Sequence, residues 1–253
     1  MALKYGKLAP KFNKKTLSFA KYLTPDAPVI EPPSKVFLEY KIPPDTIGMY
    51  GNDQYGDCVF AGIAHWLMLI TAHTGKMIVP ELSDVLAMYE RVCPGFDPTT
   101  DANDNGAAVT DGLNDWMVNG LCGHKIDGWA AIDPKNLIHR RLGLFMFLGV
   151  GVGIQCPALA QQQFLAGQTW DVAADDGGIE GGHFIFESGE GSDGHNYETW
   201  GKGDQKGTNA WDATYTDESY IVLTHDLVES ASAKTPFGFD YPALQNALTA
   251  MRV

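Results

Sequence analysis

The stretch GNDQYGDCVFAGIAHW, residues 51–66, joins a glycine-rich polar run to an apolar run that predicts a buried helix. The apolar run continues to residue 74, covers nearly every side of the helix, and is followed by Gly75 as a suitable stop. Cys58 falls in the first turn, where free backbone N–H groups and the helix dipole favour a thiolate. Cys58 is therefore either a nucleophile at a helix N-terminus or a small buried side chain, as most free cysteines are.

The residues around Cys58 bear on its chemistry. Gly51 and Gly56 allow a close polar approach, and the first N–H groups of the helix could hold an oxyanion. Asp57 can cap the helix, but its charge would oppose a thiolate beside it. His65 lies about 10 Å further along the helix, so a general base must come from elsewhere in the chain.

His183 is the candidate base. It follows two glycines in GGHFIFES, residues 181–188, and opens a predicted strand, which is a rigid support. The stretch NYETWGK, residues 196–202, predicts a neighbouring strand that carries Glu198 and Trp200. Glu198 would orient the imidazole and Trp200 would exclude water from it. The alternative is an ordinary strand-end histidine beside a core tryptophan.

The order of the elements predicts an α+β protein with two lobes and a cleft between them. Helices come first and strands later. Helices are expected over 58–74, 81–92, 110–120, 133–143, 157–167 and 240–251, and strands over 144–154, 183–188, 196–201 and 219–225.

An extended, proline-rich and basic arm is expected over residues 1–50, ahead of one domain over 51–253. The helical lobe of that domain covers about 51–142, and the β-rich lobe covers about 143–253. Residues 1–25 carry six lysines and no acid, although the chain has a net charge of −13. The acidic body argues against nucleic-acid binding. The arm could lie on this body, dock onto an acidic partner, or remain solvated.

Several other classes are disfavoured. No apolar run is long enough to span a bilayer and no secretory signal is visible, so no membrane partner is expected. Four irregularly spaced cysteines indicate neither a disulfide framework nor a zinc site, and no metal or cofactor is predicted. GEGSDG, residues 189–194, matches a dinucleotide motif but precedes a predicted strand instead of a helix. DANDNG, residues 101–106, lacks the glutamate that an EF-hand requires.

The order of these motifs resembles the papain-like cysteine peptidase superfamily. The resemblance is carried by GDC and its helix, DNGAAVTDGLNDWMVNGL (104–121), LGLFMFLGVGVGI (142–154), GGHFIF (181–186) and ETWG (198–201). The chain is most similar to papain-like proteins of phages and bacteria, which share a proline-rich N-terminal arm and the GGH and TWG motifs.

The resemblance implies a central helix carrying Cys58, packed against an antiparallel sheet or barrel lobe. It implies that Cys58 is the nucleophile and His183 the base, with Glu198 in the place of an orienting asparagine. Asn52, in the place of a glutamine, would hold the oxyanion. The residues expected to line the cleft are Gly56, Asp57, Asn105, Gly106, Gly182 and Trp200.

The expected function is a thiol hydrolase that cleaves peptide or isopeptide bonds by a Cys-His-(Glu) mechanism. Its partner would be a peptide or protein substrate, and the acidic stretch DDGGIE, residues 175–180, favours basic or neutral ones. The alternative is a catalytically relaxed scaffold, such as a phage virion component docked to a protein assembly partner through its arm. The expected location is accordingly cytoplasmic or virion-associated.

Overall fold

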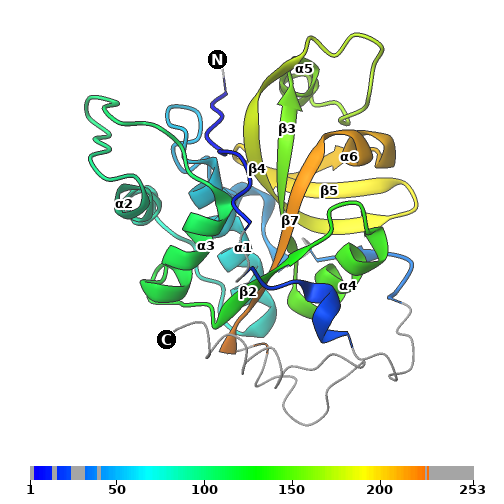
Figure 1. Cartoon of the computed structure of the whole chain (residues 1–253), viewed down its shortest axis with the longest axis horizontal. Helices are drawn as coiled ribbons and strands as arrows, with labels where there is room; N and C mark the ends of the chain where they lie inside the picture. The colour runs from blue at the N-terminus through cyan, green and yellow to red at the C-terminus, as the bar shows by residue number, and fades with distance from the viewer. Residues whose placement is uncertain (1–2, 13–15, 24–31, 39–40, 226, 228–253) are drawn as a thin grey trace.

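The computed structural model describes residues 3–12, 16–23, 32–38, 41–225 and 227, and it combines helices with an antiparallel sheet (Figure 1). The helices are α1 (Cys58–Thr74), α2 (Leu82–Val92), α3 (Val109–Val118), α4 (Leu137–Phe147), α5 (Ala158–Leu165) and α6 (Asn209–Tyr215), with short 3-10 turns η1 (Phe19–Tyr22) and η3 (Pro44–Thr46). The strands are β1 (Val36–Phe37), β2 (Gly128–Ile132), β3 (Val150–Pro157), β4 (Ile179–Gly191), β5 (Gly194–Thr199), β6 (Lys202–Gly207) and β7 (Thr216–Leu223). The α+β prediction is confirmed.

The sheet is ordered β2-β7-β3-β4-β5-β6, and β1 pairs with β4 beside this path. Every one of these pairings is antiparallel. One hydrophobic cluster gathers around α1, α2 and α3, and a second gathers around β3 with residues of α4, α5 and α6. Strand β4 contributes to both clusters, so the sheet separates the two cores.

Helix α1 is the central helix, and every side chain from Cys58 to Thr71 is buried. Its apolar character on all sides explains this position, because such a helix is stable only inside a core. Gly62 lets the helix approach β4 closely. A Cβ atom at Gly62 would lie 2.5 Å from the Phe184 ring. This close approach sets the cysteine end of α1 against the middle of β4.

The boundary between α4 and β3 differs from the prediction. The predicted strand over 144–154 is helical to Phe147, because one apolar run serves both elements. Leu148 has a φ of 55° and Gly149 a φ of 120°, and this left-handed turn ends the helix before β3 begins. The helix also starts later than predicted, since the Asn136 side chain accepts the His139 amide and caps it.

Three elements had no clear sequence signal. Strand β2 lies within the predicted helical lobe yet pairs with β7. Strand β6, KGDQKG, lacks the apolar alternation that marks a strand, and α6 is only seven residues long. The predicted helix over 240–251 lies outside the described residues.

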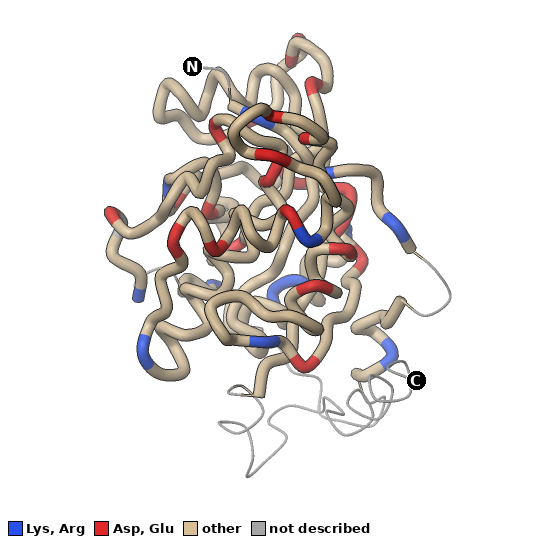
Figure 2. The backbone as a smooth tube through the Cα atoms, turned by 90° about the vertical axis from the view of Figure 1, so that its left-hand side faces the viewer, with Lys and Arg blue, Asp and Glu red and all other residues tan. Residues whose placement is uncertain are grey.

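The described parts of the N-terminal arm lie on the body. Residues 3–8 pass between the α1–α3 side of the molecule and the sheet (Figure 1). The ring of Phe19 in η1 packs edge-on against the ring of Phe147 in α4, with centroids 5.8 Å apart. Strand β1, also in the arm, pairs with β4. Acidic residues are spread over the body that these basic segments contact (Figure 2). Among the described residues, no helix combines the length and apolarity needed to cross a bilayer.

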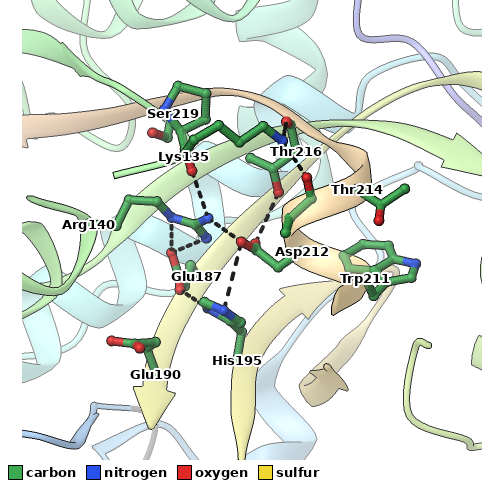
Figure 3. Close-up of polar contacts among 12 residues, drawn as sticks. Lys135, Arg140, Glu187, Glu190, His195, Trp211, Asp212, Thr214, Thr216 and Ser219 are labelled. Atoms are coloured by element: carbon green, nitrogen blue, oxygen red, sulfur yellow. Dashed lines mark hydrogen bonds and ion pairs between the residues drawn. The ribbon is translucent and has the colours of Figure 1, made fainter. Parts of the chain in front are cut away.

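A buried ion cluster joins α4, β4, β5 and α6 (Figure 3). The Arg140 guanidinium lies 2.7 Å from Glu187 Oε2 and 2.6 Å from Asp212 Oδ2. His195 Nδ1 lies 2.6 Å from Glu187 Oε1, and the Tyr197 hydroxyl donates to Asp212. With His195 protonated, two cations balance two carboxylates, as burial of charge requires.

The charge on His195 predicts a pH dependence of folding stability. Burial alone would lower the pKa of His195, but Glu187 and Asp212 outweigh it and raise that pKa above the ordinary 6.5. The stabilisation is therefore complete below about pH 6.5 and is lost as the pH rises through the raised pKa. We expect the free energy of unfolding, measured with urea between pH 6 and 9, to fall more steeply in the wild type than in His195→Gln. Parallel curves would contradict a charged His195.

Candidate active site

Cys58 is the first residue of α1, and it is 1% exposed. The first N–H groups of a helix have no partner within the helix, so the sulfur lies where donors and the positive end of the dipole converge. The backbone amide of Phe184 on β4 lies close enough to stabilise a thiolate at Cys58. The cysteine and the segment containing His183 therefore form one site.

His183 is held on two sides. Its ring stacks on Trp200, with centroids 4.2 Å apart and planes 16° apart. Its Nε2 atom lies 2.7 Å from the Thr199 hydroxyl oxygen. The other ring nitrogen, Nδ1, is buried and has no hydrogen-bond partner among the described residues. Nδ1 is thus the nitrogen left to exchange a proton with a neighbouring group.

The hydrogen-bond partner of His183 is Thr199. It is not Glu198, the residue that the motif resemblance indicated. The register of β5 with β6 shifts between Tyr197 and Thr199, so Glu198 and Thr199 lie at an irregular point of the strand. A side chain on Gly203 would come within 2.8 Å of Glu198 Oε2, which shows that Glu198 faces β6. Trp200 stands where predicted, stacked on the histidine.

Asn52 is buried near the start of α1, but its amide is already engaged. Its Nδ2 atom donates to the Tyr55 carbonyl oxygen at 3.2 Å. Asp57, the residue that precedes the helix, is fully buried, and burial raises the pKa of its carboxyl well above the ordinary value. Asp57 also contributes to the raised pKa of the Cys58 thiol, so it opposes a thiolate there, as the sequence indicated.

Residues 3–8 lie over the site and form hydrogen bonds with residues on both sides of it. Gly6 accepts a hydrogen bond at its carbonyl oxygen from the Ala107 amide at 2.8 Å. Lys7 donates its amide to the Gly182 carbonyl oxygen at 3.0 Å and forms a parallel bridge with Ala107. The segment therefore bridges the loop before α3 and the strand that carries the histidine.

The start of this segment is fixed by other site residues. Lys4 donates its amide to the Asn52 carbonyl oxygen at 3.2 Å and accepts from Trp200 Nε1 at 3.4 Å. The Tyr5 ring lies edge-on to the rings of His183 and Trp200, with centroids about 6 Å away. The segment thus covers the histidine and its tryptophan.

Glycines make the close fit possible. A Cβ atom at Gly6 would lie 1.7 Å from the Gly56 carbonyl oxygen. A Cβ atom at Gly106 would lie 2.0 Å from the Gly6 carbonyl oxygen, and one at Gly182 would lie 2.2 Å from the Lys7 carbonyl oxygen. The glycines expected to line the cleft therefore contact the chain's own N-terminal segment. Asn105, also expected there, is exposed and donates to the Asn103 carbonyl oxygen.

The pair is uncharged in this state. Burial raises the pKa of Cys58 to about 12, although the Phe184 and Gly6 amides offset part of the rise. Burial, with a smaller contribution from the nearby Lys7 ammonium, lowers the pKa of His183 to about 3. At neutral pH the site therefore holds a thiol and a neutral imidazole, in contrast to the thiolate that the helix N-terminus alone would favour.

The fold is that of papain-like cysteine proteases. The structure is similar to xylellain, a cysteine protease from Xylella fastidiosa, with a TM-score of 0.66 and 13% sequence identity over 88% of this chain and 96% of that one. It is also similar to procathepsin B S9 from Trypanosoma congolense (TM-score 0.56, 12% identity, 88% and 86% covered) and the Carica candamarcensis cysteine protease CMS1MS2 (0.51, 14%, 76% and 99%). No protein-family model and no curated protein matches the sequence.

Proposed function

We propose that this chain is a cysteine peptidase whose own residues 3–8 keep the cleft closed. One observation carries the proposal: a cysteine at the N-terminus of a buried helix shares a site with a histidine whose Nε2 is bonded to Thr199 and whose Nδ1 has no hydrogen-bond partner among the described residues. A histidine fixed through one nitrogen and available through the other is suited to general base catalysis. The papain-like fold supports the same class of reaction.

The reaction requires the segment to leave. Cys58 Sγ would then attack the carbonyl carbon of a peptide bond while His183 Nδ1 accepts the thiol proton. The oxyanion would be stabilised by the Cys58 backbone N–H at the helix N-terminus. His183 would return the proton to the leaving amine as the carbon–nitrogen bond breaks, and water would hydrolyse the thioester. Thr199 and Trp200 would hold the ring in place through both steps.

The segment is bonded on both sides of the site. The Gly6 amide N–H faces the Cys58 sulfur, whereas the Gly6 carbonyl oxygen is bonded to the Ala107 amide. Residues 3–8 therefore fill the space beside Cys58 that a substrate would need, and they would block the site until they are displaced. This favours a latent peptidase that is activated when the segment is displaced.

A non-catalytic scaffold, which would act as a structural or binding protein, is the competing function. The observation that favours it is the engaged amide of Asn52, which leaves one expected oxyanion donor occupied. A scaffold would show no peptidase activity even with the segment displaced. The two functions therefore differ in a measurable outcome.

The test uses the full chain with Gly6→Ala, a substitution that the 1.7 Å approach to Gly56 does not permit in the closed state. We expect this protein to hydrolyse a fluorescent protein substrate, and His183→Gln in the same background to lower kcat/KM by about a hundredfold or more. The Cys58→Ala protein, which lacks the proposed nucleophile, measures the hydrolysis that contaminating proteases cause. Hydrolysis that is equal with and without His183, or absent from the Gly6→Ala protein, would refute the proposal.

A further inference from the structure

The stretch DANDNG, residues 101–106, has no role in the reaction described above, yet it contributes Asp104 to the site. The Asp104 carboxylate accepts the backbone amide of Gly56 through both oxygens, Oδ1 at 2.8 Å and Oδ2 at 3.1 Å. The Tyr89 hydroxyl on α2 donates to the same Oδ1 atom at 2.6 Å. Asp104 therefore joins the turn that precedes Cys58 to helix α2.

Tyr89 extends this connection to the loop before α3. The Tyr89 hydroxyl accepts the Gly106 amide at 2.9 Å while it donates to Asp104. Tyr89 is fully buried, so its hydroxyl relies on these protein partners. Ala107, the residue after Gly106, donates its amide to the Gly6 carbonyl oxygen at 2.8 Å. Hydrogen bonds thus link the backbone that borders the closed segment to the backbone that precedes the cysteine.

The Gly56 amide is a suitable point from which to place Cys58. The next residue, Asp57, precedes α1, and its carbonyl oxygen accepts two amides of the first helical turn, at 2.8 Å and 3.1 Å. A shift at Gly56 would therefore move this turn, together with the sulfur and the free N–H groups of the helix. A charge-assisted hydrogen bond to a backbone amide is shorter and stronger than a neutral one. Asp104 can thus hold the turn more firmly than an uncharged side chain would.

Asp104 differs from the other acidic residues of its loop. Asp97 accepts its side-chain hydrogen bonds from within the loop, and Asp101 is exposed. Asp104 is half-buried, and a Cβ atom at Gly56 would lie 3.2 Å from its Oδ1 atom. The link contains no atom of residues 3–8, so it does not depend on the closed state.

We propose that Asp104 is a positioning residue of the peptidase, which holds the Gly56 amide and thereby places the Cys58 sulfur for attack on the substrate. Through Tyr89 it also fixes the Gly106 backbone at the edge of the cleft. This inference rests on the proposed peptidase function and adds a residue that acts without touching the substrate. The two ends of the link should affect different kinetic constants, because one end holds the nucleophile and the other borders the bound chain.

The test compares Asp104→Asn with Asp101→Asn in the full-length Gly6→Ala protein, on one internally quenched peptide that this parent cleaves. Asparagine has nearly the same shape, but it lacks the charge and places an NH₂ group where one oxygen accepts the Gly56 amide. We expect Asp104→Asn to lower kcat by about tenfold or more and to leave KM within about twofold, because a misplaced nucleophile slows the reaction without weakening binding. Asp101→Asn removes the same charge from an exposed site and should change neither constant.

Tyr89→Phe tests the other end of the link. It removes the acceptor of the Gly106 amide but leaves the hydrogen bond between Asp104 and Gly56 in place. We expect this variant to raise KM by about fivefold and to leave kcat within about twofold, because an unpaired amide loosens the backbone that borders the bound peptide. A general loss of folded structure would lower the activity of both variants without this division.

Amide hydrogen exchange, followed by NMR, measures the link without an activity assay. The Gly56 amide should exchange slowly in the wild type and about tenfold faster or more in Asp104→Asn. Fast exchange at Gly56 in the wild type, or equal kcat values for Asp104→Asn and Asp101→Asn, would overturn the positioning role and leave the peptidase proposal standing. Absence of cleavage by the Gly6→Ala parent would overturn both.

Discussion

Displacing residues 3–8 should raise the rate at which iodoacetamide alkylates Cys58 by about tenfold or more at neutral pH. The thiolate is the reacting species, and burial in the closed cleft raises the pKa of Cys58 to about 12 from an ordinary 9.0. Access of water to the sulfur lowers that pKa, and each unit of the fall increases the thiolate fraction about tenfold. Loss of the Gly6 amide and the Lys7 ammonium, which both lower the pKa in the closed state, offsets part of this change. Gly6→Ala is the change of choice, because a Cβ atom would lie 1.7 Å from the Gly56 carbonyl oxygen.

The measurement is mass spectrometry of the cysteine-containing peptides after timed alkylation. Cys122 is an internal reference because it is exposed in the closed state. Its rate should be the same in both proteins. Gly75→Ala is the matched control, since a Cβ atom there has no neighbouring atom within 4 Å. Trypsin cleavage at Lys7 would report release of the segment. Release without faster alkylation of Cys58 would show that the segment does not keep the thiol protonated.

The places of Cys58 at a helix start and of His183 on a strand could be predicted from the sequence because each residue follows a local pattern. Cys58 opens an apolar helix after a glycine-rich run, and His183 follows two glycines at a strand start. In both cases the glycines and the start of the helix or strand lie next to the residue in sequence. The order of the two motifs then indicated the papain-like fold, which the structural comparison confirms.

The residue that bonds the histidine could not be predicted in the same way. Glu198 and Thr199 are adjacent, and the register of β5 with β6 shifts between Tyr197 and Thr199, so the sequence pattern does not show which of them faces His183. A shift of one residue exchanges the two faces of a strand, so motif spacing alone cannot settle the choice. The resemblance to phage proteins stays a prediction, as does the role of Asn52.

The position of residues 3–8 over the site could not be predicted from local sequence patterns either. The arm was expected to lie on the body, on a partner or in solvent, and the described contacts place residues 3–8 within the site itself. The lysine-rich composition of the arm indicated an acidic counterpart but not which one. The counterpart at Lys7 is formed by Asp217 and Glu218, some two hundred residues away in sequence, and only the folded sheet brings them together.

Arg140→Met should lower the free energy of unfolding by about 3–5 kcal/mol, the range observed when one partner of a buried ion cluster is removed. Arg140 is 1% exposed and contacts Glu187 and Asp212. Burial alone would raise the pKa of Asp212, but Arg140 and His195 lower it to about 2, so the carboxylate depends on these cations. Methionine would leave two carboxylates facing one histidine. Urea unfolding at pH 7 measures the loss.

The neighbouring residue supplies the control. Arg141 pairs with Glu190, but its side chain is 26% exposed, so water can replace the guanidinium and Arg141→Met should cost less than Arg140→Met. Adding Glu187→Gln and Asp212→Asn to Arg140→Met should restore part of the stability, because it removes the uncompensated charges along with the cation. If Arg140→Met cost no more than Arg141→Met, the four groups would not act as an ionised cluster. The junction of α4, α6 and the sheet would then depend on apolar packing alone.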